Sequence, residues 1–462
     1  ILLLVLSLLG CTQNVPYRTG DIAPCPTENP DNPDDACNIA LIEQHEGYDL
    51  AFVEFTERGN VFDRERMAQV LAYAAELAQS ESGVAAVVFV HGWKHNANGN
   101  DPNVHSFRDL LQQAAALRTA DSLPAGRKLL GVYIGWRGLS LDLGFLTNAS
   151  YWERKQVAHQ VGKGGVTEFL LRLERTVVDP ERSNKNLLLV TGHSFGGAIV
   201  LASLNEVLLE RMVSAEPARQ GCGAAKPGCS VCLQSRPFGH GVVLLNPAIE
   251  ANEALQLKEN AARMCFAPTQ NRLLHVISSD ADKATNKSFR MGQWLGVSLR
   301  WREAELQRRF GEHTVLLDET DLDTTTVGNY MPFRTGYLRQ DDKDPTGWAY
   351  QNCVGAALGD EDCIDEPDQR NNHIPAATNE PLAFIQTDGE FIADHNDVFN
   401  AKVAGYLMAI IAEQRYKRRL AGDGDIRAEE IPAECVRENG NFNFGGCFDN
   451  YWQRFDKLDK ES

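Results

Sequence analysis

The sequence has a deficit of basic residues. Its 462 residues include 45 Lys and Arg against 63 Asp and Glu, which gives a formal net charge of −18. A surface with that charge repels phosphate backbones, so we expect no nucleic acid among the partners. It offers no polybasic patch to anionic lipid either. Hydrophobic residues make up 43% of the chain and charged residues 23%, which excludes a wholly disordered protein.

Long apolar runs are also scarce. The only segment apolar enough to enter a membrane core is residues 1–10 (ILLLVLSLLG), which is too short to span a bilayer but typical of the h-region of a secretory signal. The basic n-region that normally comes first is missing, so we expect the true start to lie upstream.

The end of this segment, Leu8-Leu9-Gly10-Cys11, resembles the lipobox of bacterial lipoproteins. The resemblance implies cleavage before Cys11 and lipidation of that residue; the alternative is an ordinary signal peptide with a chance Cys. Thr12, in place of an Asp, implies the outer membrane as the destination. The Pro-, Asn- and Asp-rich stretch that follows is typical of a solvated tether, so we assign residues 11–47 to the lipidated Cys and tether.

Zinc-site signals are weak. Cys229-Ser-Val-Cys232 has the spacing of half a zinc site, but a second Cys-x-x-Cys or a nearby His pair is absent, so disulfides are favoured. Cys11 apart, the cysteines number 11 − 1 = 10, and several form short local pairs in polar stretches: Cys25 with Cys37, Cys353 with Cys363, and Cys435 with Cys447. Such pairs are typical of exported proteins.

Apolar runs alternate with amphipathic segments from residue 48 onward. We expect helices at residues 63–79 and 197–212, and strands at residues 49–55, 84–90, 128–136, 186–190, 241–246, 272–278 and 382–386. Repeated strand–helix alternation predicts an α/β fold with one mostly parallel sheet covered by helices.

The uneven spacing of these strands predicts one domain, residues 48–415, with insertions at 139–185, 213–240 and 286–380. The first could fold over the sheet edge as a lid. The tryptophans of the third, Trp294, Trp301 and Trp348, fit either an independent small core or a substrate-facing cap. Residues 416–462 form a polar C-terminal extension that we expect to be peripheral.

The strongest chemical motif is Gly192-His193-Ser194-Phe195-Gly196, which fits G-x-S-x-G between an apolar strand and a helix. In that context the tight turn exposes the Ser hydroxyl, and the glycines avoid collisions across the turn. The helix N-terminus then directs backbone N–H groups toward a developing oxyanion. The motif predicts Ser194 as a nucleophile.

A second motif, Val90-His91-Gly92-Trp93, ends the strand at residues 84–90. His91 and His95 have the i, i+4 spacing of a helical metal site, but the Gly and Asn residues around them favour a loop. We therefore expect neither a metal nor an organic cofactor.

The nucleophile needs a base, because a neutral Ser hydroxyl is a poor nucleophile at neutral pH. His395 follows the last predicted strand and precedes a predicted helix, where the base belongs; His373 is the competitor. Asp280 and Asp282 both follow the strand at residues 272–278, and Asp282 is preferred because the longer loop extends its reach.

Taken together, these motifs resemble the α/β-hydrolase superfamily and, within it, uncharacterised bacterial lipase/esterase-like proteins. The similarity covers residues 48–415 and is carried by FVHGWKHNA at 89–97, WRG at 136–138, GHSFGG at 192–197, LLNPAIEA at 244–251, D-x-A-T at 282–285 and HND at 395–397. It implies an α/β-hydrolase fold, a Ser194–His395–Asp282 triad, and oxyanion donors in the backbone amides of Trp93 and Phe195.

The expected function is a lipid-anchored serine hydrolase of the bacterial envelope that cleaves carboxylic esters, with a small-molecule or lipid ester as substrate. An acyltransferase or a thioesterase could use the same triad, because an acyl-enzyme can be discharged by more than one acceptor. A non-catalytic lipoprotein that binds a partner is the alternative from another class. Substrate class does not follow from the fold.

Overall fold

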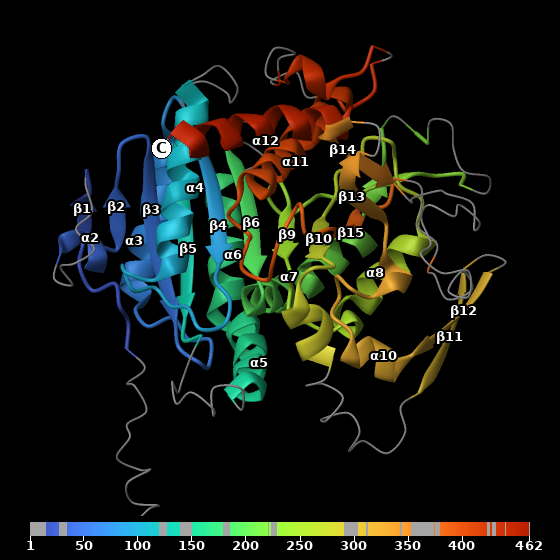
Figure 1. Ribbon diagram of the computed structural model, residues 1–462, viewed down its shortest axis with the longest axis horizontal. Helices are drawn as coiled ribbons and strands as arrows, with labels where there is room; N and C mark the ends of the chain where they lie inside the picture. The colour runs from blue at the N-terminus through green and yellow to red at the C-terminus, as the bar shows by residue number, and fades with distance from the viewer. Residues whose placement is uncertain are drawn as a thin grey trace, which may run out of the picture.

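The computed structural model describes residues 15–26, 35–119, 127–138, 150–178, 185–219, 221–222, 229–290, 304–310, 313–341, 344–352, 374, 379–422, 426, 431–438 and 440–461. Its centre is an 11-stranded sheet that runs from β1 at one edge to β14 at the other (Figure 1). In spatial order the strands are β1 (Ile22–Pro24), β2 (Ile42–Gln44), β3 (Tyr48–Phe55), β5 (Lys128–Trp136), β4 (Val84–Val90), β6 (Leu187–His193), β9 (Val242–Leu245), β10 (Leu274–Ser279), β15 (Leu382–Thr387), β13 (Gly336–Asp341) and β14 (Asp344–Asn352).

The sheet is mostly parallel. Only the β2–β3 and β13–β14 pairs within it are antiparallel among the described strands. All seven strands expected from the sequence are present within three residues of their expected ends, so the α/β class is confirmed. Because parallel strands end at the same edge, the loops after β4, β6, β9, β10 and β15 gather on one side of the molecule.

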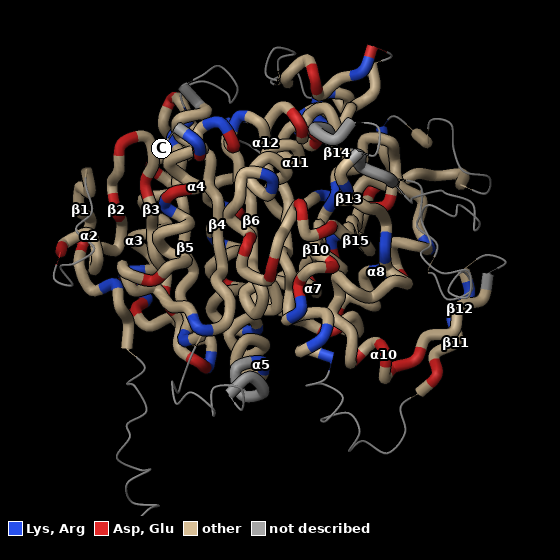
Figure 2. The backbone as a smooth tube through the Cα atoms, viewed as in Figure 1, with Lys and Arg blue, Asp and Glu red and all other residues tan. Residues whose placement is uncertain are grey.

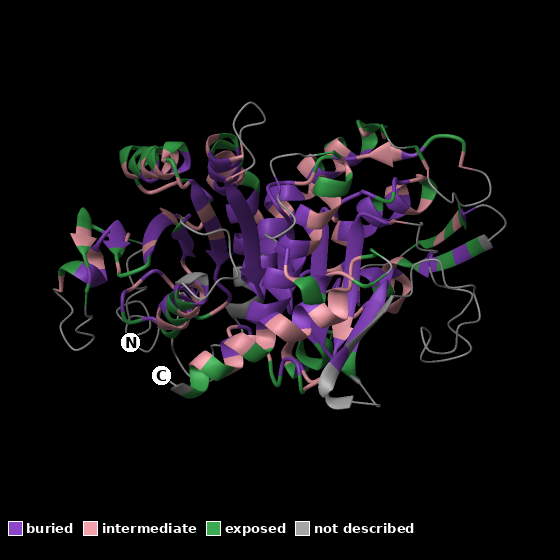
Figure 3. Ribbon diagram, turned by 90° about the horizontal axis from the view of Figure 1, so that it is seen from above, coloured by how far each residue is buried: buried purple, intermediate pink, exposed green. Residues whose placement is uncertain are grey.

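Helices cover both faces of the sheet, which Figure 3 shows from above. The helices of one face are α3 (Arg64–Gln79), α6 (Thr167–Val177), α7 (Phe195–Val213) and α8 (Leu255–Arg263), and those of the other are α4 (Pro102–Thr119), α11 (Ala401–Leu420) and α12 (Phe444–Glu461). In β6, Leu188 and Val190 join the first core while Leu187 and Leu189 join the second. Alternate side chains of a strand point to opposite faces, so a strand covered on both sides is apolar throughout.

Charged residues are nearly absent from the middle of this sheet. Figure 2 shows Lys, Arg, Asp and Glu distributed over the helices and loops, whereas β4, β6 and β9 carry none.

None of the described helices is both long and apolar enough to cross a bilayer.

The first insertion belongs partly to the body of the fold. Phe169, Leu170 and Leu173 of α6 are fully buried in the core shared with α3 and α7. Helix α5 (Ser150–Val161) projects beyond the carboxyl end of β4 (Figure 1), and its Lys155 forms an ion pair with Glu250 in the loop after β9. Residues 139–149 of the expected lid lie outside the described residues.

The third insertion extends the central sheet. Strand β13 pairs with β15 and β14 pairs with β13, so neither forms an independent domain. Trp348 of β14 is buried against Phe391 and Phe448 in the second core. It is therefore neither in a separate small core nor in a cap, whereas Trp294 and Trp301 lie outside the described residues. The remaining elements here are β11 (Glu305–Phe310), β12 (His313–Asp318) and α10 (Glu319–Thr324).

The C-terminal extension is less peripheral than expected. The expected boundary at residue 416 falls inside α11, and α12 packs against that helix with Cys447, Phe448 and Phe455 buried. These apolar residues recur at helical spacing, so the segment completes the core of its face.

Four disulfides are present in the described residues: Cys25–Cys37, Cys222–Cys232, Cys229–Cys265 and Cys435–Cys447. Two of the expected local pairs are thus confirmed, while Cys353 and Cys363 lie outside the described residues. Cys229 and Cys232 bond to different partners, which staples the second insertion with its short strands β7 (Glu216–Pro217) and β8 (Leu233–Gln234).

Candidate active site

Ser194 forms the whole turn between β6 and α7. Its backbone has φ 56° and ψ −122°, a strained conformation for a residue other than Gly that costs about 1–3 kcal/mol. A Cβ on Gly196 would lie 1.9 Å from the carbonyl oxygen of Val90, and one on Gly192 would lie 2.6 Å from that of Gly196. The turn therefore has room only for glycine on either side of the serine, as the motif predicts.

The structure brings Ser194, His395 and Asp282 together. Nε2 of His395 lies 2.8 Å from Oγ of Ser194, and Nδ1 of the same ring lies 2.8 Å from Oδ2 of Asp282. The Asp282 side chain is fully buried, whereas the His395 side chain is 23% exposed. A serine, an imidazole and a buried carboxylate are thus linked in series, which is the geometry of an activated nucleophile.

Asp282, and not Asp280, contacts the imidazole. Its Oδ2 also accepts a hydrogen bond from the Thr285 hydroxyl at 2.6 Å, and its Oδ1 accepts from the amide of Ala284 at 2.8 Å. Burial alone would raise the pKa of Asp282, but the hydrogen bonds from His395 and Thr285 outweigh it and leave that pKa below its usual range. Asp282 therefore stays ionised beside the ring.

Asp280 has a different environment. Burial and the neighbouring carboxylate of Asp388 raise its pKa. Its backbone amide pairs with the carbonyl of Thr387. His373, the alternative candidate for the catalytic base, lies outside the described residues.

The loop after β4 is joined to the end of β5. The backbone N–H of Trp136 donates to Nε2 of His91 at 3.1 Å, and its indole N–H donates to the carbonyl of His91 at 2.9 Å. Farther along, Gly138 exchanges backbone hydrogen bonds with Lys94 and His95. The WRG motif thus fastens the loop that carries Trp93.

The loop after β4 lies against Ser194. A Cβ on Gly92 would be 2.8 Å from Cβ of Ser194, so the backbone that leads into Trp93 passes directly beside the serine. Phe195, the other expected oxyanion donor, is the first residue of α7 and is buried. The two residues expected to supply the oxyanion donors therefore lie near Ser194: Trp93 follows the glycine that approaches it, and Phe195 follows it in sequence.

Strained backbone is concentrated around this site. In the part of the chain that the structure describes, the non-glycine residues with positive φ are Lys94, Ser194, Asn246 and Asn379. Lys94 follows Trp93, and Asn246 ends the strand next to that of Ser194. Such strain persists where the surrounding structure enforces it, which is common at active sites.

His91 does not have the surroundings of a metal ligand. Its ring is fully buried between Tyr133 and Trp136, and both ring nitrogens are engaged, Nδ1 with the carbonyl of Gly92 and Nε2 with the amide of Trp136. Burial lowers its pKa to about 4. His95 binds Asp101 instead. Within the described residues, no three His, Cys, Asp or Glu side chains are grouped to hold a metal ion.

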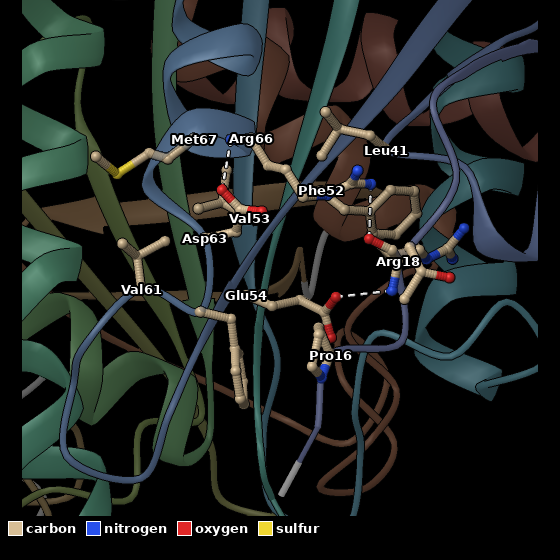
Figure 4. A pocket seen from close by; sticks show the side chains of 12 residues that line it. Pro16, Arg18, Leu41, Phe52, Val53, Glu54, Val61, Asp63, Arg66 and Met67 are labelled. Carbon is tan, nitrogen blue, oxygen red and sulfur yellow. Dashed lines mark hydrogen bonds between the residues drawn. The ribbon is translucent and has the colours of Figure 1, made fainter.

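A cavity of about 300 Å³ lies elsewhere, beside the end of β3 and beneath the N-terminal segment (Figure 4). Its charged side chains bind the protein itself. Glu54 accepts hydrogen bonds from the amides of Tyr17 and Arg18, and Arg66 donates to the carbonyls of Arg18 and Gly20. These contacts hold the N-terminal segment on the sheet, so we assign the cavity a structural role.

Three residues near the triad had no role in the sequence interpretation. Thr285 bonds Asp282, while His193 and Asn246 contact the backbone of His395. All three lie inside motifs that carried the family resemblance, at 192–197, 244–251 and 282–285. Membership in these motifs is the sequence feature that could have identified them.

No protein-family model, no curated protein and no solved structure matches this chain.

Proposed function

We propose that this chain is a serine hydrolase of the α/β-hydrolase superfamily that cleaves carboxylic esters through an acyl-enzyme. The observation that carries the proposal is the continuous hydrogen-bonded series from Ser194 through His395 to the buried Asp282. The strained turn at Ser194 and the mostly parallel sheet with helices on both faces support it.

In the proposed mechanism, Nε2 of His395 takes the hydroxyl proton of Ser194 while Oγ attacks the ester carbonyl. The tetrahedral intermediate places its negative oxygen at the backbone amides of Trp93 and Phe195, where each donor contributes a few kcal/mol. The intermediate collapses as His395 returns the proton to the departing alcohol. Water then attacks the acyl-enzyme with the same base, and the acid and free Ser194 result.

Asp282 orients the ring and stabilises its cationic form. Because the pKa of this carboxyl is held below its usual range, it remains an anion while the imidazole takes the proton. The bonds from Thr285 and Ala284 keep the carboxylate in one orientation, so the ring has a single productive tautomer.

We also propose that the protein acts in the bacterial envelope, anchored in the outer membrane through lipidated Cys11. The four disulfides support an oxidising compartment. Replacing Cys11 with Ser should release the protein from the membrane fraction; retention of the variant would contradict the anchor.

The first experiment is labelling of the purified protein with a fluorophosphonate probe, followed by mapping of the modified peptide. An activated serine forms a covalent phosphonate at Ser194, and the Ser194→Ala variant should not label. Turnover of p-nitrophenyl esters of increasing acyl length would then define the substrate range.

Two outcomes contradict the proposal. A folded wild-type protein that fails to label, with detergent present to admit the probe, would favour a non-catalytic binding protein. Labelling at a serine other than Ser194 would place the reactive site elsewhere.

A further inference from the structure

We propose that His193 and Asn246 are positioning residues for the base, and that they act by holding the backbone carbonyl of His395. The inference rests on the proposed function, because it concerns the geometry of the same triad. It adds to the triad a second set of contacts that acts on the main chain of the base and not on its ring.

His193 is placed for this role by the strand that carries the nucleophile. It is the last residue of β6 and only 2% exposed, and its Nε2 lies 2.7 Å from the carbonyl oxygen of His395. A carbonyl only accepts, so Nε2 carries the proton and donates. Nδ1 is then the unprotonated nitrogen of the ring, and it is buried without a hydrogen-bond partner.

His193 is therefore a neutral donor. Burial lowers the pKa of His193 well below its usual range, and the nearby His395 lowers it further. The two rings lie with their centroids 4.9 Å apart. A second positive charge at that distance would oppose the imidazolium that forms on His395 during the reaction, so a ring that stays neutral can hold the base without that cost.

Asn246 reaches the same carbonyl from the neighbouring strand. Its side-chain amide lies 3.4 Å from the carbonyl oxygens of both Asp394 and His395. The Oδ1 of Asn246 accepts a hydrogen bond from the backbone amide of Ser279, and its backbone amide donates to the carbonyl of Ile277. Both partners lie at the end of β10. With φ at 42°, its backbone has the left-handed conformation that Asn tolerates better than most residues.

Together these contacts join the carboxyl ends of β6, β9 and β10 to the loop that carries His395. That loop follows β15 and leaves the imidazole partly exposed. Contacts to the main chain of His395 therefore restrain the base at a point that the ring contacts to Asp282 and Ser194 do not reach. A displacement of about 1 Å in a catalytic group can cost about 100-fold in rate. Fixing the carbonyl of the base is therefore a direct way to preserve the distance to Ser194.

The test compares substitutions that keep or remove the donor. The amide of His193→Gln reaches the position of Nε2 and can still donate to the carbonyl, whereas His193→Leu fills the space without a donor. His275→Leu is the matched control: His275 is equally buried and makes one side-chain hydrogen bond, to the hydroxyl of Tyr406 on α11.

The readouts are the rate constant of fluorophosphonate labelling at Ser194, and kcat and KM for p-nitrophenyl acetate. We expect His193→Leu to lower the labelling rate and kcat by about 10- to 100-fold with KM within about twofold. His193→Gln should recover most of the loss, and His275→Leu should label at the wild-type rate. If His193→Leu does not fold, His193→Asn replaces it, because its shorter amide reaches only the position of Nδ1.

The outcomes separate this inference from the proposed function. Wild-type protein that labels, with His193→Leu or His193→Asn labelling equally fast, overturns the positioning role and leaves the hydrolase intact. Failure of His193→Gln to recover activity, or an equal loss in His275→Leu, overturns it as well, because the effect would then reflect core packing. Absence of labelling in the wild type contradicts the proposed function itself.

Discussion

Two histidine–aspartate pairs lie at the carboxyl edge of the sheet, and they are closely similar in isolation. The Nδ1–oxygen distance is 2.8 Å between His395 and Asp282 and 2.9 Å between His95 and Asp101. The carboxylates are 0% and 5% exposed, and the imidazoles are 23% and 17% exposed. In each pair burial alone would raise the carboxyl pKa, and the hydrogen bond from the histidine helps to bring it below the usual range.

The pairs differ in their third partner. His395 contacts the hydroxyl of Ser194, which the strained turn after β6 presents to it. Asp101 immediately precedes α4, where it accepts hydrogen bonds from the amides of Asn96 and Asn103. A His–Asp pair is therefore not a catalytic signature by itself. Under the proposed function, the contact with the strained serine distinguishes the His395–Asp282 pair from the His95–Asp101 pair, which joins a loop to the start of α4.

The largest expected effect comes from breaking the first pair. Asp282→Asn should lower kcat by about 10⁴-fold, because the amide no longer selects the tautomer of His395 that accepts the serine proton. Asp280→Asn is the matched control, two positions from Asp282, and should stay within about threefold of wild type. Steady-state hydrolysis of p-nitrophenyl acetate measures both. A loss in Asp280→Asn that exceeds the loss in Asp282→Asn would reverse the assignment of the acid.

A third histidine at this edge, His91, has only backbone groups as hydrogen-bond partners of its ring. Burial lowers the pKa of His91 to about 4, below the value of about 6.5 expected in the unfolded chain. As the pH falls, the unfolded chain binds the proton first, so the stabilisation present above pH 6.5 is lost progressively between about pH 6.5 and 4. The difference corresponds to about 3 kcal/mol of unfolding free energy.

Guanidinium unfolding at pH 7.5 and 4.5 tests this expectation. His91→Gln should show a smaller loss of stability between the two pH values than wild type, by about 3 kcal/mol. Equal losses in the two proteins would show that His91 does not titrate on unfolding.

The smallest effect is expected at the second pair. Asp101→Asn should lower the free energy of unfolding by about 1–2 kcal/mol, because one capping oxygen before α4 becomes a donor. Its kcat should fall by less than about tenfold, since the change lies outside the series that ends at Ser194. A loss of kcat as large as that of Asp282→Asn would mean that His95 takes part in the reaction.

Much of the fold was predictable because its signals are local. A strand buried on both faces is continuously apolar, so the bounds of β4 and β5 were identifiable from the sequence, and those of β6 within three residues. The helix α3 was marked by Asp63, whose side chain accepts from the amides of Glu65 and Arg66. By contrast, the sequence places β13 and β14 in an insertion, because only the pairing of β13 with β15 and of β14 with β13 makes them strands of the central sheet.

The candidate site divides in the same way. The sequence by itself determined the turn at Ser194, because Gly192, Gly196 and the adjoining strand and helix act within a few residues of one another. It favoured Asp282 over Asp280 only through the reach of the loop and the family resemblance, since both carboxylates follow the same strand. The choice depends on which one the loop directs at His395, more than 100 residues away in the chain.

Only the tertiary structure gave His193 and Asn246 their contacts. Both bond a carbonyl about 150 to 200 residues farther along the chain, and they do so because parallel strands end at one edge of the sheet. The disulfide partners of Cys229 and Cys232 were decided in the same way. Local sequence determines the conformation of short segments, whereas the partner of a side chain depends on how the sheet brings distant segments together.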